Sequence, residues 1–314
     1  MSLALVTGAA GFIGSALTER LRAAGWTVRP LGRGAGAFEG GIECGDLGAA
    51  DATLVDDWLH GVDVVFHLAG RAHRRDEGSE LERYARYRRD NVATTQAWFL
   101  AAQRNHVQRF VFLSSIKVLG DFGAQPFAEN SDPDPQDVYA QTKLEAERHL
   151  EDTRSRARTA VSIVRPPLVY GPGVKGNFRS LLNAVGRGWP LPLGRADAPR
   201  SLVARANLVD LLIAAVNDQA EFRILHARDD VDSTVAELVA MIARAFGRSP
   251  RLIAVPRRMM CVGARTTGMM DLYQRLFEPC AVDDAATRAA LGWQPVVPQQ
   301  SAIDEVAAWW RTQR

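Results

Sequence analysis

The sequence predicts an α/β protein with a doubly wound parallel sheet and a smaller C-terminal domain. Three observations carry this prediction. Short unbroken apolar runs alternate with longer amphipathic stretches in the first half, a glycine-rich turn follows the first apolar run, and prolines and glycines cluster after Arg165, where the alternation ends. Apolar strands that alternate with helices are typical of a parallel sheet covered on both faces.

Each expected element follows from its local pattern of apolar, glycine and polar residues. Strands are expected at Leu3–Thr7, Thr27–Leu31, Val62–Leu68, Arg109–Leu113 and Ala160–Val164. Helices are expected at Ile13–Ala24, Asp51–His60, Asn91–Arg104, Val138–Asp152, Asn207–Val216, Thr234–Phe246 and Ser301–Trp310. Residues 166–176 and 186–199 are expected to be irregular and to line a pocket.

A chain of 314 residues exceeds the usual size of a single domain. We expect a dinucleotide-binding Rossmann domain over residues 1–176, with residues 203–227 packing back on it. Residues 177–202 and 228–314 are expected to form the substrate-binding domain. No internal repeat or long linker interrupts this arrangement.

Composition excludes several classes of function. Lys and Arg total 38 against 36 Asp and Glu, and this balance gives no reason to expect a nucleic-acid or membrane partner. Cys44, Cys261 and Cys280 are too far apart to indicate a disulfide framework or a metal site, so no metal and a reducing cytoplasm are expected. No apolar run approaches the length of a membrane span, and the apolar N-terminus reads as a buried strand rather than a signal peptide.

The glycine-rich turn has the sequence Thr7-Gly-Ala-Ala-Gly-Phe-Ile-Gly14. Its spacing is GxxGxxG rather than GxGxxG, and it lies between a strand and a helix. Glycines at such a turn let a pyrophosphate approach the backbone and the positive helix N-terminus. The turn therefore predicts a dinucleotide site, and an ordinary turn without ligand is the alternative.

The end of the second strand bears on the choice of cofactor. An acidic residue there normally holds the ribose hydroxyls of NAD, but the stretch ends in Leu31-Gly32-Arg33. Arg33 could meet a 2′-phosphate, which favours NADP(H) with NAD(H) as the other possibility, or it could be a solvated arginine. Asp46 could approach the adenine amine or simply form a turn.

Tyr139 and Lys143 stand four residues apart in a predicted helix, so both side chains can face one site. A neighbouring ammonium is expected to lower the pKa of the tyrosine and allow proton exchange with a substrate oxygen. Ser114 and Ser115 end the preceding strand, and one of them is expected to bond the same oxygen while the other forms a turn. His67, late in an apolar strand, is expected to be a core residue.

The motifs stand in one order along the chain: TGAAGFIG (7–14), GDL (45–47), HLAG (67–70), Asn91, SSIKVLG (114–120), YAQTK (139–143), RPPLVYGPG (165–173) and LGWQP (291–295). Together they resemble the extended short-chain dehydrogenase/reductase family, which includes nucleotide-sugar epimerases, dehydratases and ketoreductases. The resemblance runs over nearly the whole chain and implies a Rossmann fold, a nicotinamide cofactor and a UDP-sugar substrate.

The resemblance also implies site residues. The catalytic residues would be Ser115, Tyr139 and Lys143. The cofactor would be held by Gly8, Gly11, Phe12, Ile13, Gly14, Asp46, Leu47, Leu68, Ala69, Asn91, Tyr139, Lys143 and Pro166, besides Arg33. The substrate would be held by Ser115, Lys117, Asn177, Phe178 and Arg200. For Lys117 a solvated surface position is an equal alternative.

Departures from the family pattern affect the sugar contacts. Leu119 replaces a tyrosine, Asn207 stands where an aspartate is usual, and Leu168 stands where several relatives have an asparagine. A dehydratase needs a carboxylate pair after the active-site hydroxyl, and Ile116 and Lys117 stand there instead, which argues against that activity.

The SSIKV and RPPLVYGPGVKGNF stretches resemble a bacterial surface-polysaccharide subgroup. We therefore expect a UDP-4-keto-6-deoxy-N-acetylhexosamine 4-reductase with Tyr139 as proton donor. The alternative is a UDP-glucose or UDP-N-acetylglucosamine 4-epimerase that retains NAD. A non-catalytic dinucleotide sensor is more remote, because it would not need Ser115, Tyr139 and Lys143.

Two further expectations concern partners. The stretch Arg71–Arg89 holds seven arginines but also Asp76, Glu77, Glu80 and Glu82, which indicates a solvated helix rather than an RNA-binding surface. By resemblance, the helices Asn91–Arg104 and Val138–Asp152 would pair with their mates in a homodimer. The apolar residues Val92, Ala97, Trp98, Leu100 and Ala101 could instead all face the core.

Overall fold

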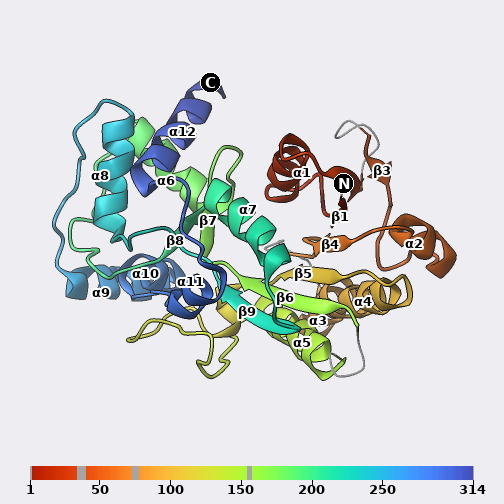
Figure 1. Cartoon of the computed structure of the whole chain (residues 1–314). Helices are drawn as coiled ribbons and strands as arrows, with labels where there is room; N and C mark the ends of the chain where they lie inside the picture. The colour runs from red at the N-terminus through yellow and green to blue at the C-terminus, as the bar shows by residue number, and fades with distance from the viewer. Residues whose placement is uncertain (1, 34–39, 73–77, 154–157, 314) are drawn as a thin grey trace.

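A parallel sheet forms the centre of the computed structural model, which describes residues 2–33, 40–72, 78–153 and 158–313. Within these ranges the sheet has seven strands in the order β3-β2-β1-β4-β5-β6-β9, and all the pairings are parallel (Figure 1). The strands are β1 (Leu3–Thr7), β2 (Thr27–Gly32), β3 (Ile42–Glu43), β4 (Val64–His67), β5 (Arg109–Leu113), β6 (Ala160–Arg165) and β9 (Phe222–His226). The strand order reverses between β1 and β4, and in such sheets ligands bind in the crevice at this point.

Helices cover both faces of this sheet. Helices α1 (Gly14–Ala23) and α7 (Arg205–Ala214) pack on one face, where Leu17 and Leu208 share a core with Val6. Helices α2 (Ala52–Leu59), α4 (Thr94–Arg104) and α5 (Val138–Thr153) pack on the other. Helix α7 contains Asn207, whose helix was expected to lie on this sheet.

A helix was expected to begin at Asn91, but α4 begins at Thr94. Helix α3 (Glu80–Arg88) precedes it and runs through a π-helical turn (Arg89–Ala93) directly into α4. A capping box between Ser79 and Glu82 starts α3, and its spacing is the signal in the sequence that marks this helix.

The rest of the chain builds a second apolar core beyond the carboxyl ends of the central strands (Figure 1). It contains a two-stranded parallel sheet of β7 (Leu168–Tyr170) and β8 (Leu202–Ala204). Its helices are α6 (Gly176–Gly186), α8 (Val235–Ala245), α9 (Arg257–Thr267), α10 (Met270–Phe277) and α12 (Gln299–Thr312). Helix α11 (Ala285–Leu291) lies against β9 instead, and its Leu291 packs on the core beside the sheet. The stacked rings of Tyr170 and Phe178 lie in this core with Trp310.

Several elements depart from expectation. Residues 166–176 are not wholly irregular, because Leu168–Tyr170 forms β7. Strand β9 and helices α3, α6, α9, α10 and α11 were not predicted. The strands expected at Leu3–Thr7 and Arg109–Leu113 have the expected bounds. None of the helices in the described ranges is long and apolar enough to cross a membrane.

Candidate active site

The glycine turn follows β1, and its three glycine positions leave no room for a side chain. A Cβ on Gly14 would lie 2.2 Å from the carbonyl oxygen of Gly8, and one on Gly11 would lie 3.0 Å from it. Gly8 has a φ of 69° and closely approaches the backbone of Ala69, with which an added Cβ would make a 3.0 Å contact. The turn is thus a bare backbone surface at the N-terminus of α1, as a pyrophosphate site requires. Phe12 and Ile13 are partly buried beside it.

The segment after β4 lies against this turn. The hydroxyl of Thr7 accepts a hydrogen bond from the amide of Ala69 (3.2 Å) and bonds Nδ1 of His67 (3.1 Å). His67 is fully buried and stacks on Phe110, and burial lowers the pKa of its imidazole to about 3. The expectation that His67 is a core residue is confirmed.

Asn91 in the π-helical turn holds the loop that follows β4. Its Oδ1 accepts from the amide of Arg71 (2.7 Å), and its Nδ2 donates to the Arg71 carbonyl (3.1 Å) and to the hydroxyl of Thr142 (3.0 Å). Asn91 is 1% exposed, so its amide is used within the protein. These bonds tie the loop after β4 to α5. Gly70 lies in the same loop, and a Cβ added there would lie 3.3 Å from Nζ of Lys143.

The far end of the crevice holds the residues predicted to meet the adenosine. Arg33 is exposed directly after β2. Asp46 accepts from the amide of Gly48 (3.1 Å) in a turn and forms an ion pair with Arg89 (3.6 Å), and its carboxylate is exposed. Leu47 packs beneath, and its carbonyl accepts a long bond from Trp98 (3.5 Å).

The structure brings Ser115 and Tyr139 together. Ser115 follows β5, caps a short 3-10 helix through the amide of Lys117 (3.3 Å), and is hydrogen-bonded to the Tyr139 hydroxyl. Burial raises the pKa of Tyr139 to about 12, although the Ser115 bond acts in the opposite direction. The expected lowering of this pKa by Lys143 is therefore wrong, because the removal of the phenolate from water dominates.

Lys143 lies one helical turn after Tyr139, but its Nζ donates to the carbonyl of Leu113 (2.8 Å). It also lies 4.5 Å from the centre of the Phe112 ring. Burial lowers the pKa of this ammonium to about 8, and the carboxylate of Glu147 opposes that shift. Lys143 is thus a buried cation at the carboxyl end of β5.

A buried ion pair beneath Lys143 was missed. Glu147 accepts from Nε (3.0 Å) and Nη2 (2.6 Å) of Arg165 and also from the hydroxyl of Ser114, and both charged side chains are 4% exposed. Of the two serines, Ser114 is thus the structural one. The signal available in the sequence was the spacing: Glu147 follows Lys143 by one helical turn.

The predicted substrate residues differ in their exposure and in their bonds within the protein. Lys117 forms ion pairs with Asp121 (3.2 Å) and with Asp137. Arg200 is partly buried, and its Nη1 donates to the carbonyl of Glu278 (2.6 Å). Asn177 is exposed at the start of α6, whereas Phe178 is buried in the second core, so the structure gives the Phe178 side chain a packing role.

Pro166 is buried directly after β6, and its carbonyl accepts from the amide of Ile116 (3.0 Å). The edge where β1, β4, β5 and β6 end thus carries the glycine turn, Ala69, Ser115 and Pro166 side by side. Parallel strands bring such residues together although they are far apart in the sequence.

In the basic stretch before the π-helical turn, two of the arginines that the structure describes pair with carboxylates outside the stretch. Arg71 binds Asp90 (2.8 Å), and Arg88 binds Glu145 (3.3 Å). Residues 73–77, which include Arg74, Arg75, Asp76 and Glu77, lie outside the described ranges. The described part fits a helix whose charges are balanced by neighbours.

Comparison with known proteins decides the family. A model of the NAD dependent epimerase/dehydratase family matches residues 4–225. A UDP-glucose 4-epimerase of Vibrio cholerae is 34% identical over 310 residues, which are 96% of this chain and 94% of that protein. The chain belongs to the NAD dependent epimerase/dehydratase family.

Other members of this family differ in substrate. An N-acetyl-α-D-glucosaminyl-diphospho-ditrans,octacis-undecaprenol 4-epimerase of Escherichia coli O157:H7 is 27% identical over 263 residues, 82% of this chain and 77% of that protein. The structure of MoeE5 in complex with UDP-glucose and NAD superposes with a TM-score of 0.78 at 27% identity, over 99% of both chains.

The chain fits the dinucleotide that its family name implies. The backbone of Gly8, Gly11 and Gly14 forms a cradle that any added Cβ would fill, and the small residues Ala69 and Gly70 line its continuation towards Tyr139 and Lys143. When bound there, the nicotinamide would supply hydride transfer.

Proposed function

We propose that this family member is a UDP-hexose 4-epimerase. The observation that carries the proposal is the hydrogen-bonded pair of Ser115 and Tyr139 beside buried Lys143, at the edge of the sheet that carries the glycine cradle. The Vibrio cholerae relative bears that activity in its name, and the MoeE5 complex holds UDP-glucose with NAD. These names favour the epimerase over the reductase that the sequence patterns favoured.

In this proposal Tyr139 moves the proton at the sugar O4. Its phenolate takes the hydroxyl proton during oxidation, and the neutral phenol returns it during reduction. Ser115 donates to the same oxygen and keeps it within reach of Tyr139. Lys143, a buried cation one helical turn from Tyr139, would hold the cofactor rather than shift the pKa of the tyrosine. Arg200 and Asn177 would hold the diphosphate, for which a guanidinium is suited.

A second candidate is the 4-ketoreductase. Arg33, exposed at the end of β2 where no carboxylate stands, favours it because a 2′-phosphate would mark NADP(H), the usual exchangeable reductant. The cofactor preference therefore belongs to the same test as the reaction.

The test mixes the purified protein with UDP-glucose or UDP-N-acetylglucosamine and separates the C4 epimers by chromatography. Interconversion without net change in nicotinamide absorbance, lost in Tyr139→Phe, is the expected result. Stoichiometric NADPH oxidation with a UDP-4-keto-6-deoxy sugar, and no epimerisation, would assign the reductase instead. Arg33→Asp should then weaken NADPH relative to NADH.

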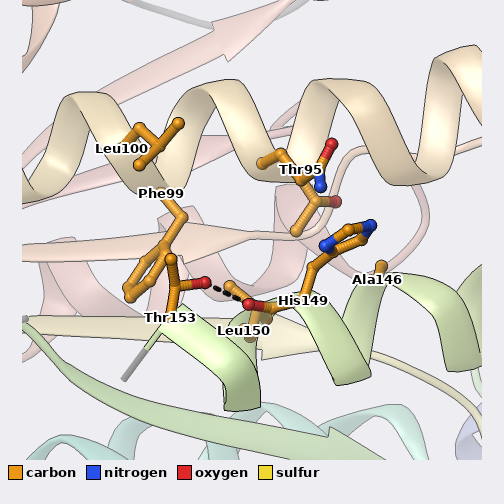
Figure 2. A pocket seen from close by; sticks show the side chains of 8 residues that line it. Thr95, Phe99, Leu100, Ala146, His149, Leu150 and Thr153 are labelled. Atoms are coloured by element: carbon orange, nitrogen blue, oxygen red, sulfur yellow. Dashed lines mark hydrogen bonds between the residues drawn. The ribbon is translucent and has the colours of Figure 1, made fainter. Parts of the chain in front are cut away.

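We propose the domain division and the homodimer on similar grounds. Residues 177–202 and 228–314 supply most of the second core, which would form the substrate side. Val92 in the π-helical turn is buried, as are Trp98 and Ala101 on α4, but Ala97 and Leu100 on α4 are exposed. Ala97 and Leu100 form an exposed stripe on α4. Figure 2 shows the hollow between α4 and α5 beside Leu100, with His149 and Leu150 of α5 on the other side of the hollow. In the proposed homodimer, α4 and α5 of the second copy would cover both the exposed stripe and the hollow.

A further inference from the structure

Lys117 lies between two carboxylates near the predicted catalytic pair. Its Nζ is 3.2 Å from Oδ1 of Asp121 and bonds Oδ2 of Asp137, and its side chain is 19% exposed. The ammonium thus donates a hydrogen bond to Asp137, and Asp121 adds a second negative charge at ion-pair distance.

Asp137 connects this ion pair to the helix that carries Tyr139. Its Oδ1 accepts from the amide of Ala140 (2.8 Å) in the first turn of α5, while Oδ2 holds Lys117. The backbone amide of Lys117 donates to Oγ of Ser115 (3.3 Å), and Ser115 is hydrogen-bonded to Tyr139. Residue 117 therefore holds Ser115 with its backbone and the start of α5 with its side chain.

The charges around Tyr139 show why the ion pair of Lys117 and Asp137 matters. The charge of Asp137 and the phenol group of Tyr87 from α3 disfavour a phenolate at Tyr139, and the Ser115 bond favours it. On α5 itself, Lys143 is balanced by Glu147. From the substrate side, Asp121 acts on the electrostatics of Arg200 as well as pairing with Lys117.

We propose that Lys117 and Asp137 are a positioning pair for Tyr139: the ion pair joins the segment that carries Ser115 to the first turn of the helix that carries Tyr139, and it sets a positive charge against the Asp137 carboxylate. This inference rests on the acid/base role of Tyr139 in the proposed function. It gives Lys117 a role in the orientation and the ionisation of Tyr139, instead of direct contact with the sugar.

The experiment combines a titration without substrate and steady-state kinetics. The NMR signal of the Tyr139 ring carbon next to the hydroxyl, assigned with Tyr139→Phe, is followed in ¹³C-tyrosine-labelled protein as the pH rises. Lys117→Met should move the onset of ionisation about one pH unit upward and lower kcat at neutral pH about tenfold, with KM changed less than about twofold.

Two variants serve as controls. Lys117→Arg keeps the charge and should restore both measurements. Asp137→Asn keeps an oxygen for the Ala140 cap but removes the negative charge, so alone it should make Tyr139 ionise earlier, and in the Lys117→Met background it should reverse the delay.

An unmoved titration in Lys117→Met, with KM raised and kcat unchanged, would overturn the proposal and make Lys117 a substrate ligand. An Asp137→Asn protein whose Tyr139 ionises no earlier than in the parent would overturn it too, even if Lys117→Met failed to fold. If no variant or parent turned over any UDP-hexose, the proposed function would fail, but the titration would still decide the inference.

Discussion

Lys143 is a cation enclosed by protein atoms, and its surroundings make stability depend on pH. Burial lowers the pKa of Lys143 to about 8 from the ordinary value of 10.5. Between these two values the unfolded chain binds more protons than the native one, so the free energy of unfolding should rise with pH across that window.

The size of this rise should be on the order of 3 kcal/mol at most. Urea unfolding of the parent and of Lys143→Met at several pH values measures it. The difference between the two proteins should change between about pH 8 and pH 10.5. Parallel profiles would show that Lys143 titrates as it does in water.

Glu147 compensates two cations in the same region. It holds Arg165 through two bonds and opposes the loss of charge on Lys143. Glu147→Gln leaves Arg165 buried without its counter-charge and should lower the free energy of unfolding by about 3 kcal/mol.

Denaturant unfolding of Glu147→Gln tests this, with the double variant Glu147→Gln/Arg165→Met as control. The double variant should lose less than the sum of the two single variants, because it leaves no uncompensated arginine. Additive losses would mean that the two side chains do not depend on one another.

Among the elements, the turn between β1 and α1 is the most constrained. Gly14→Ala would place a Cβ 2.2 Å from the Gly8 carbonyl oxygen, so we expect destabilisation of about 2 kcal/mol or more and loss of dinucleotide binding. Gly263 is the matched control, since it also lies in a helix (α9) but a Cβ there meets nothing within 4 Å.

Gly263→Ala should stabilise the protein by about 0.5–1 kcal/mol. Thermal unfolding and dinucleotide titration by calorimetry of both variants measure the contrast. Equal effects of the two substitutions would show that the turn can relax around a methyl group.

Asn207 at the start of α7 departs from the family pattern for a visible reason. Its Nδ2 donates to Oδ1 of buried Asp229 (2.8 Å) and to the carbonyl of Val297 (2.9 Å). Asp229 also accepts from the hydroxyl of Tyr170 (2.7 Å), and burial raises the pKa of its carboxyl group.

Asn207→Asp would set two carboxylates against each other and should cost about 2 kcal/mol at neutral pH. Their repulsion raises the native pKa of the pair, so the loss should shrink as the pH falls and one carboxyl group takes up a proton. Urea midpoints at neutral and mildly acidic pH measure this, and a loss that is independent of pH would contradict it.

The sequence predicted most of the central sheet because its strands are unbroken apolar runs. It did not predict β9, which begins with Phe222 and Arg223 and has only a partly buried first half. Helices α9 and α10 were also not predicted. Both helices are amphipathic, so the sequence carried a signal for them, although in α9 no residue is fully buried.

For the site, motif spacing indicated the Ser115 and Tyr139 pair, but it could not indicate what surrounds them. The high pKa of Tyr139 follows from its enclosure by other elements. The buried bonds of Asn91 to Arg71 and Thr142 depend on how the π-helical turn meets α5. Both are tertiary facts, and no local spacing encodes them.

At the scale of the whole molecule, the proposed homodimer can be tested through the exposed stripe of α4. Leu100 is 46% exposed beside the hollow between α4 and α5. Leu100→Glu should place charges opposite one another at the two-fold interface and yield a monomer in light scattering after size-exclusion chromatography.

Leu81 in α3 is 77% exposed and provides the matched control. Leu81→Glu should leave the dimer intact. A parent protein that is already monomeric at micromolar concentration would remove the basis for this prediction.

Two tryptophans near the C-terminal end bear on the order in which the chain can fold during synthesis. Trp293 packs with Val6 and Leu17 in the core beside the sheet and donates to Asp210 (3.0 Å), while Trp310 packs in the second core so closely that a Cβ on Gly186 would lie 2.7 Å from its ring. A ribosome delivers the chain from its N-terminus. Both cores therefore stay unfinished until residues 293–310 have left the exit tunnel, and the nascent chain must expose apolar surface to chaperones until then.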